Sequence, residues 1–229
     1  MGKKKALIIG STGLIGRELL PVLLEEDAYE HVYALVRRPR HAKHKKLTEF
    51  VIDFDHLQAE ESFFQVDDVF CCLGTTIKKA GSRDAMKKVD VEYPVRIAQL
   101  AKKRGATHFL VVSATGASTN SLFSYSRMKG ELEEELKNIS YNTLSILHPS
   151  LLLGNREEYR FMEGLANKAI KGIEKVKRSS ISSRIAIEGK KVALAMNSIA
   201  QTSEKGVHVY SPKQIEAKAQ RETVGFPKL

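Results

Sequence analysis

The stretch Ala-Leu-Ile-Ile-Gly-Ser-Thr-Gly-Leu-Ile-Gly, residues 6–16, decides the fold. Its first four residues form an apolar run that predicts a β-strand, and an amphipathic pattern from Gly13 to about Glu26 predicts a helix. Gly10 permits a sharp turn between the two, Gly13 allows the backbone to approach a pyrophosphate, and Gly16 allows the helix to pack close to the strands. The pattern therefore predicts a dinucleotide site at the positive end of a helix dipole.

Short apolar runs alternate with helical patterns along the rest of the chain. Strands are expected at 6–9, 32–36, 50–52, 68–72, 108–112, 143–147 and 207–210, and helices at 13–26, 89–104, 125–138 and from 212 onward. This order predicts an α/β fold: one Rossmann-type, doubly wound parallel sheet of six to seven strands with helices on both faces. We expect a single domain over 1–229, in which 151–187 form a small substrate-side segment at the carboxyl edge of the sheet.

The composition narrows the class of partner. The chain has 229 residues and a net charge of +10, which favours an anionic partner: nucleic acid, a membrane surface or a phosphorylated small molecule. No apolar run approaches ~18 residues, so no membrane helix is expected. The basic segment 168–191 holds no aromatic residue, which does not favour nucleic acid.

The two cysteines, Cys71 and Cys72, are adjacent, and a bond between them would be strained. The sequence has neither a CxxC pair nor a Cys/His spacing typical of a metal site, so no metal is expected. We interpret this cysteine usage as that of a reduced, cytoplasmic compartment.

A basic run follows the second expected strand. In a dinucleotide-binding fold, an acidic residue here selects NAD, whereas arginine pairs with the 2′-phosphate of NADP. Arg37 and Arg38 occupy this place, which predicts NADP(H) in preference to NAD(H). Asp53 follows the third strand, where adenine is usually covered, although it is equally suited to an ordinary turn. The segment Leu73-Gly74-Thr75 follows the fourth strand, where the chain passes near the cofactor.

Tyr125 and Lys129 form a YxxxK pattern, which places both side chains on one face of a helix. A neighbouring ammonium favours the phenolate, so the tyrosine can exchange a proton with a carbonyl or alcohol oxygen. The preceding strand ends near two hydroxyls, and either Ser113 or Thr115 can bond the same oxygen. The alternative is structural: Tyr125 is an amphipathic residue at a helix start, and Lys129 pairs with Glu133 four residues later.

These residues together resemble the short-chain dehydrogenase/reductase superfamily. The similarity rests on GSTGLIG at 10–16, the Arg37-Arg38 pair, LGTT at 73–76, YSRMK at 125–129 and HPSLLLGNRE at 148–157. Within that superfamily the chain looks like the atypical branch that contains the Tat-interacting-protein-type oxidoreductases and their small bacterial relatives.

The resemblance implies a Rossmann domain that binds NADPH. It implies Tyr125 as proton donor or acceptor, Lys129 as its partner, and the following cofactor contacts: Ser11, Thr12, Gly13, Leu14 and Ile15 with the pyrophosphate, Arg37 and Arg38 with the 2′-phosphate, Leu73 and Gly74 on the adenosine side, Leu152 facing the nicotinamide, and Arg160 as a further basic contact. The chain departs from the family pattern at Ala114, where many members carry Ser, and at Asp90, where extended members often carry Asn.

The expected function is NADPH-dependent hydride transfer to or from a small carbonyl or alcohol substrate. The alternative on the same fold is a non-catalytic NADP(H)-binding sensor or regulator. Sugar-nucleotide epimerase or dehydratase chemistry is a third reading, although the chain is short for the usual substrate lobe. Monomer and homodimer both remain open, and the acidic run at 131–135 weighs against a dimer built on that helix.

Overall fold

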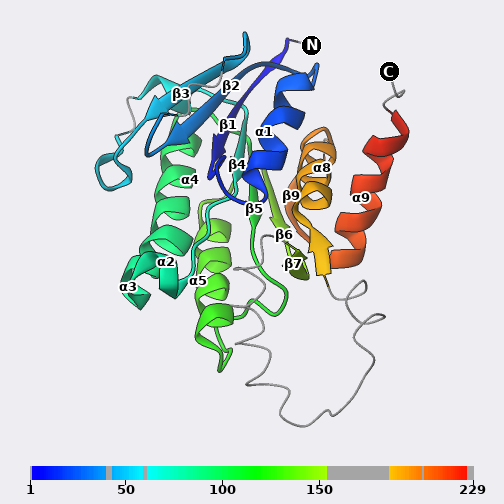
Figure 1. The fold of residues 1–229 in the computed structure, drawn as a ribbon. Helices are drawn as coiled ribbons and strands as arrows, with labels where there is room; N and C mark the ends of the chain where they lie inside the picture. The colour runs from blue at the N-terminus through cyan, green and yellow to red at the C-terminus, as the bar shows by residue number, and fades with distance from the viewer. Residues whose placement is uncertain (1, 40–42, 59–60, 154–185, 203, 226–229) are drawn as a thin grey trace.

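A computed structural model describes residues 2–39, 43–58, 61–153, 186–202 and 204–225 (Figure 1). Its strands are β1 (Lys4–Ile9), β2 (Tyr29–Val36), β3 (Leu47–Val51), β4 (Asp68–Cys71), β5 (His108–Val112), β6 (Thr143–Leu147), β7 (Leu151–Leu153), β8 (Ala186–Glu188) and β9 (Gly206–Tyr210). Its α-helices are α1 (Gly16–Glu25), α2 (Ile77–Ala80), α3 (Arg83–Lys87), α4 (Tyr93–Lys103), α5 (Ser124–Asn138), α8 (Gly189–Ala200) and α9 (Pro212–Gly225).

Seven of the strands form one parallel sheet in the order β3-β2-β1-β4-β5-β6-β9. This is a doubly wound arrangement, in which the order of strands reverses direction between β1 and β4. β7 and β8 pair separately as a short parallel ribbon. The predicted fold class is therefore confirmed. Ile9 pairs with Cys71, so the carboxyl ends of β1 and β4 meet where the glycine turn begins.

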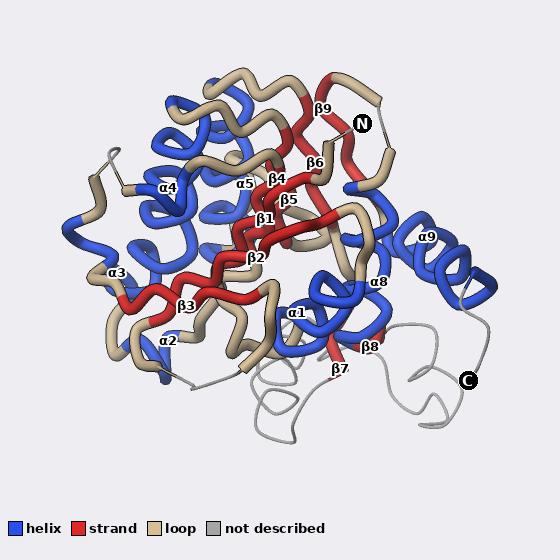
Figure 2. The backbone as a smooth tube through the Cα atoms, turned by 90° about the horizontal axis from the view of Figure 1, so that it is seen from above, coloured by secondary structure: helices blue, strands red, loops and turns tan. Residues whose placement is uncertain are grey.

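Alternate residues of β1 supply the two layers of the core. Leu7 and Ile9 face α4 and α5, whereas Ala6 and Ile8 face α1, α8 and α9. Figures 1 and 2 show these two groups of helices on opposite sides of the sheet. Because side chains of a strand point alternately to its two faces, the part of a strand that is covered on both sides must be apolar throughout, which is why residues 6–9 of β1 form an apolar run.

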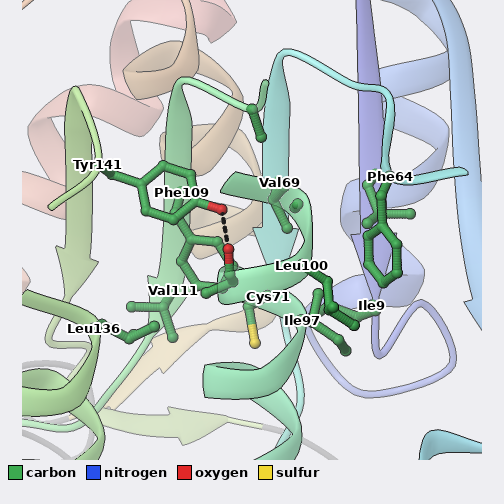
Figure 3. Close-up of a cluster of buried hydrophobic side chains, with 14 of the residues drawn as sticks. Ile9, Phe64, Val69, Cys71, Ile97, Leu100, Phe109, Val111, Leu136 and Tyr141 are labelled. Atoms are coloured by element: carbon green, nitrogen blue, oxygen red, sulfur yellow. Dashed lines mark hydrogen bonds between the residues drawn. The ribbon is translucent and has the colours of Figure 1, made fainter. Parts of the chain in front are cut away.

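Aromatic rings pack in the core layer beneath α4 and α5. The ring of Phe109 in β5 lies 5.4 Å between centroids from that of Tyr141, which precedes β6, with the two planes tilted by 49°. The Tyr141 hydroxyl donates a 2.6 Å hydrogen bond to the carbonyl oxygen of Ala98 in α4 (Figure 3). Cys71 lies in the same apolar layer, and burial raises the pKa of its thiol to about 12. Both cysteines are free, so Cys71 acts as a small apolar side chain here.

The structure corrects several predicted boundaries. The first helix begins at Gly16, not Gly13, and the third strand covers 47–51 rather than 50–52. The helix predicted at 89–104 is divided: a π-helical turn at Lys88–Glu92 precedes α4. Pro94 lacks the N–H that would bond the carbonyl of Asp90, so the regular hydrogen-bond ladder cannot run through this point. The sequence pattern did not predict the short ribbon of β7 and β8, nor the helices α2, α3 and α8.

Candidate cofactor site and active site

The glycine turn between β1 and α1 is built by close backbone contacts. Gly10 has φ of +79°, and a Cβ placed on it would lie 2.5 Å from the carbonyl oxygen of Cys72. A Cβ on Gly16 would lie 2.2 Å from the carbonyl oxygen of Gly10. The protein itself therefore requires glycine at both positions. At Gly13 the nearest atom, the Gly10 carbonyl oxygen, would be 3.3 Å away, a tight contact that demands glycine much less strictly than the contacts at Gly10 and Gly16.

The remaining turn residues divide between the core and the surface. Ser11 and Ile15 are buried, Leu14 is partly buried, and Thr12 is exposed. The Gly13 N–H donates to the Gly10 carbonyl at 3.0 Å, which keeps the turn tight ahead of α1. The turn thus forms a backbone-lined cradle at a helix N-terminus, and its chemistry fits a pyrophosphate.

Arg37 and Arg38 directly follow β2 and are both exposed. Because β2 lies beside β1 in the sheet, the two guanidinium groups belong to the edge that carries the glycine turn. Asp53 lies beyond β3 at the same edge. Its carboxylate accepts from the Asp55 N–H at 3.0 Å and contacts His56 Nδ1 at 2.7 Å, and the first of these bonds is the largest cause of its lowered pKa. Asp53 therefore has a turn role in the structure, whatever its role toward adenine.

The loop after β4 is tied to α5 through Asp90. Asp90 Oδ2 accepts a hydrogen bond from the Thr75 N–H at 2.9 Å, and Asp90 Oδ1 lies 2.8 Å from Lys129 Nζ. Both side chains of this ion pair are buried, at 1% and 3% exposed. Gly74 has room for a Cβ, with the nearest heavy atom at 3.8 Å, and Leu73 packs against the core. Asp90 thus fixes both the segment Leu73-Gly74-Thr75 and the ammonium of Lys129.

The electrostatics of Tyr125 differ from the sequence expectation. Lys129 Nζ lies 5.9 Å from the centre of the Tyr125 ring and lowers the pKa of the phenol, as expected. Desolvation is the larger effect, however, and the net pKa of Tyr125 is raised. The pKa of Lys129 is also raised, because the neighbouring Tyr125 and Asp90 favour the ammonium against its own burial. Tyr125 is therefore protonated at neutral pH, and Lys129 is charged.

Both candidate hydroxyls are engaged within the protein. The Ser113 hydroxyl donates to Glu133 Oε1, and His148 Nε2 lies 2.7 Å from the same oxygen. The Thr115 hydroxyl lies 3.2 Å from the carbonyl oxygen of His148 and 3.0 Å from that of Pro149. The suggested pairing of Lys129 with Glu133 is not found: Lys129 binds Asp90, and Glu133 is buried against Ser113 and His148.

Two predicted contacts cannot be placed as side chains. Leu152 lies in β7, whose backbone is described, and Arg160 lies outside the described residues. Sequence reasoning in turn missed the roles of Glu133 and His148. The available signal was positional. Tyr125, Lys129 and Glu133 recur every four residues on one helix. Ser113 directly follows β5, and His148 directly follows β6, the neighbouring strand.

The fold and the glycine turn together define a dinucleotide-binding protein of the Rossmann class. A family model described as NAD(P)H-binding matches residues 10–188, and the chain belongs to this family. It is 37% identical over 172 residues to Protein HTATIP2 of Rattus norvegicus, which covers 73% of this chain and 71% of that protein. It is 36% identical over 154 residues to Protein FMP52, mitochondrial, of Eremothecium gossypii, with coverage of 67% and 69%.

Solved structures share the fold at low identity. MoeE5 in complex with UDP-glucuronic acid and NAD has a TM-score of 0.66 and 18% identity, covering 92% of this chain and 76% of its own. A short-chain dehydrogenase/reductase superfamily protein from Agrobacterium tumefaciens with bound NAD has a TM-score of 0.62 and 15% identity, covering 90% and 76%. The predicted NAD(P)-binding Rossmann family is confirmed by the family model, and the fold is shared with this superfamily protein. Among the described residues, none of the helices has the length and apolar character needed to cross a bilayer.

Proposed function

We propose that the protein is an NADPH-dependent oxidoreductase that transfers hydride to or from a small carbonyl or alcohol substrate. The observation that carries this proposal is the buried Asp90–Lys129 pair one helical turn from Tyr125, at the carboxyl edge of the sheet that also bears the glycine turn. A buried ammonium beside a phenol is the arrangement that proton exchange with a carbonyl oxygen requires.

The residues present fit the cofactor. The backbone N–H groups of the turn at 11–15 would face the pyrophosphate, and Arg37 and Arg38 would pair with the 2′-phosphate. Leu73 and Gly74 would lie on the adenosine side, with Asp53 and Thr75 close by. Leu152 would face the nicotinamide, and Arg160 would add a basic contact. When bound, NADPH would supply the hydride.

The chain's own groups would handle the proton. Tyr125, protonated at neutral pH, would donate to the substrate oxygen during reduction and accept from it during oxidation. Lys129, held by Asp90, would stabilise the phenolate left behind. Ser113 would lie beside the same oxygen, with Thr115 supporting the loop next to it. The sequence favours Ser113 over Thr115 slightly, because Ser113 lies directly at the end of β5.

Replacement of Tyr125 tests the chemistry. Tyr125→Phe is expected to lower NADPH-dependent reduction of responsive aldehydes, ketones or quinones by about 10²–10⁴-fold, the range for loss of general acid–base catalysis. Nucleotide binding should persist. Tyr33→Phe, which removes a hydroxyl on β2, is the matched control. Intact activity in Tyr125→Phe would disprove the mechanism, and tight NADPH binding without turnover in the wild type would favour the sensor alternative.

The nucleotide preference is tested by titration. Wild-type protein is expected to bind NADPH more tightly than NADH. Arg37→Ala with Arg38→Ala should remove most of that difference, because the 2′-phosphate loses its charged partners. The same change at the exposed Arg83 of α3 should have no effect. Equal affinity of the wild type for both nucleotides would contradict the role given to Arg37.

The remaining expectations also stay proposals. The partner is a small carbonyl or alcohol compound, 151–187 form the substrate side of a single domain, the location is cytoplasmic, and the assembly is a monomer or homodimer. Glu133 is buried, so the acidic run at 131–135 places fewer charges on the surface of α5 than the sequence suggests.

A further inference from the structure

A chain of hydrogen bonds leads from Ser113 toward the surface. The Ser113 hydroxyl donates to Glu133 Oε1, and His148 Nε2 lies 2.7 Å from that oxygen. Ser113 is 4% exposed, the Glu133 side chain is 8% exposed, and the His148 side chain is 20% exposed. The three groups therefore form a line whose inner end is a buried hydroxyl and whose outer end reaches water.

The topology brings these residues together. Val112 pairs with Leu147, so Ser113 and His148 are the residues that immediately follow two neighbouring strands. The Ser113 N–H donates to the Leu147 carbonyl at 2.8 Å, which extends the ladder by one step and holds the two residues side by side. Glu133 comes from α5, eight residues after Tyr125, and its face of the helix packs toward these strand ends.

This line is separate from the Lys129–Asp90 pair. Lys129 Nζ bonds Asp90 on the side of β4, whereas Glu133 bonds groups that follow β5 and β6. Joining a helix to a sheet through a buried carboxylate carries a desolvation penalty of several kcal/mol. An apolar side chain or an amide would avoid that penalty. A carboxylate differs from an amide of the same shape in one respect relevant here: it can take up and release a proton.

We propose that Ser113, Glu133 and His148 form a proton path between the active site and the surface. This inference rests on the proposed oxidoreductase function. Carbonyl reduction takes one proton from Tyr125 in each turnover. The His148 imidazolium gives a proton to the Glu133 carboxylate, and the resulting carboxyl group gives its proton to Ser113. Ser113 in turn gives its hydroxyl proton to the Tyr125 phenolate, which the proposed function places with Ser113 at the substrate oxygen. His148 regains a proton from water. Oxidation of an alcohol moves one proton outward by the same steps.

The isosteric change Glu133→Gln separates proton transfer through residue 133 from the structural support that its hydrogen bonds provide. The glutamine oxygen can still accept from Ser113 and His148, but the amide does not relay a proton. We expect kcat for the reduced carbonyl to fall about 100-fold, with the dissociation constant for NADPH and the thermal midpoint nearly unchanged. Wild-type kcat in a folded Glu133→Gln protein would overturn the path.

Chemical rescue of the outer residue gives the second measurement. His148→Ala is expected to lower kcat about tenfold, and added imidazole should restore it. Across a series of methylimidazoles, the restored rate should vary with the pKa of the added base. His208→Ala, which removes the imidazole of β9, is the control and should lose no activity and show no rescue.

The outcomes distinguish this inference from the function on which it rests. If the wild type is active, Tyr125→Phe is inactive, and imidazoles fail to restore His148→Ala, the path is wrong and the oxidoreductase function stands. If Glu133→Gln does not fold, the rescue of His148→Ala decides. Absence of turnover by the wild type removes both proposals together.

Discussion

At the scale of single residues, the Lys129–Asp90 pair is the contact on which the site depends most. The sequence indicated that Lys129 lies beside Tyr125, and it offered Glu133 as an alternative partner. The actual partner comes from the π-helical turn at Lys88–Glu92, far away in the sequence. Since both charges are buried, neither can be satisfied by water when the other is removed.

Asp90→Ala is therefore expected to lower the free energy of unfolding by about 3–5 kcal/mol, because it leaves the Lys129 ammonium buried and unpaired. Replacing both residues, Asp90→Ala with Lys129→Met, should recover much of that loss. Urea unfolding monitored by circular dichroism measures the effect. As the control, Glu134→Gln breaks the exposed pair with Lys137 and should cost less than about 1 kcal/mol. Comparable costs for the two single variants would contradict this account.

The contacts that the sequence did not reveal were missed for one physical reason. Tyr125 and Lys129 could be found because their spacing along one helix determines their shared face. The partners of Ser113 and Glu133 depend on the register between β5 and β6 and on how α5 lies across the strand ends. Those are tertiary quantities, and no local pattern encodes them.

At the scale of elements, the turn between β1 and α1 has two kinds of glycine. Gly10 and Gly16 are required by severe contacts with the protein's own backbone, whereas a Cβ on Gly13 would make a milder contact at 3.3 Å. The spacing of the three glycines suggested a role for each one, but it did not separate folding from binding.

Gly16→Ala is expected to destabilise the fold, because its Cβ would lie 2.2 Å from the Gly10 carbonyl oxygen. Gly13→Ala should lower the thermal midpoint much less than Gly16→Ala, because its Cβ would lie 3.3 Å from the Gly10 carbonyl oxygen. It should bind NADPH more weakly, because a methyl group would face the pyrophosphate. Thermal unfolding and nucleotide titration separate the two effects. Gly2→Ala, which meets no atom within 4 Å, is the control. Unchanged NADPH affinity in Gly13→Ala would place the pyrophosphate elsewhere.

Strands were the most predictable elements, and the region before α4 was the least. The strands buried on both faces read as apolar runs, so their existence followed from composition alone. The turn at Lys88–Glu92 could not be predicted from amphipathic periodicity, because a π-helical turn shifts the helical phase by one residue.

At the scale of the whole molecule, a buried histidine makes the free energy of unfolding depend on pH. His108 begins β5, and its Nε2 lies 2.9 Å from Ser145 Oγ of β6. Burial, with smaller contributions from the charges of Lys4 and His208, lowers the pKa of His108 to about 3. Between its ordinary pKa near 6.5 and about 3, the unfolded chain binds a proton at this position that the folded chain does not.

The free energy of unfolding is therefore expected to fall as the pH falls through that window, by about 1.4 kcal/mol per pH unit from this group. His108→Gln, which keeps a polar partner for Ser145, should remove that contribution. Asp68 has a raised pKa and acts in the opposite direction, but it is common to both proteins. Urea unfolding at pH 7 and pH 5 measures the difference, with His31→Gln as control. Parallel pH dependence in the wild type and His108→Gln would contradict the prediction.

The order of the strands also has a consequence for synthesis. Thr143 of β6 pairs with Gly206 of β9, and the side chains that cover one face of the sheet beside α1 come from α8 and α9. A ribosome adds about 5–20 residues per second, so β9 is synthesised on the order of several seconds after β6. During that interval a nascent chain exposes an unpaired strand edge and an open apolar face. Chaperones that recognise such surfaces would bind the chain during this interval, before α8 and α9 emerge from the ribosome.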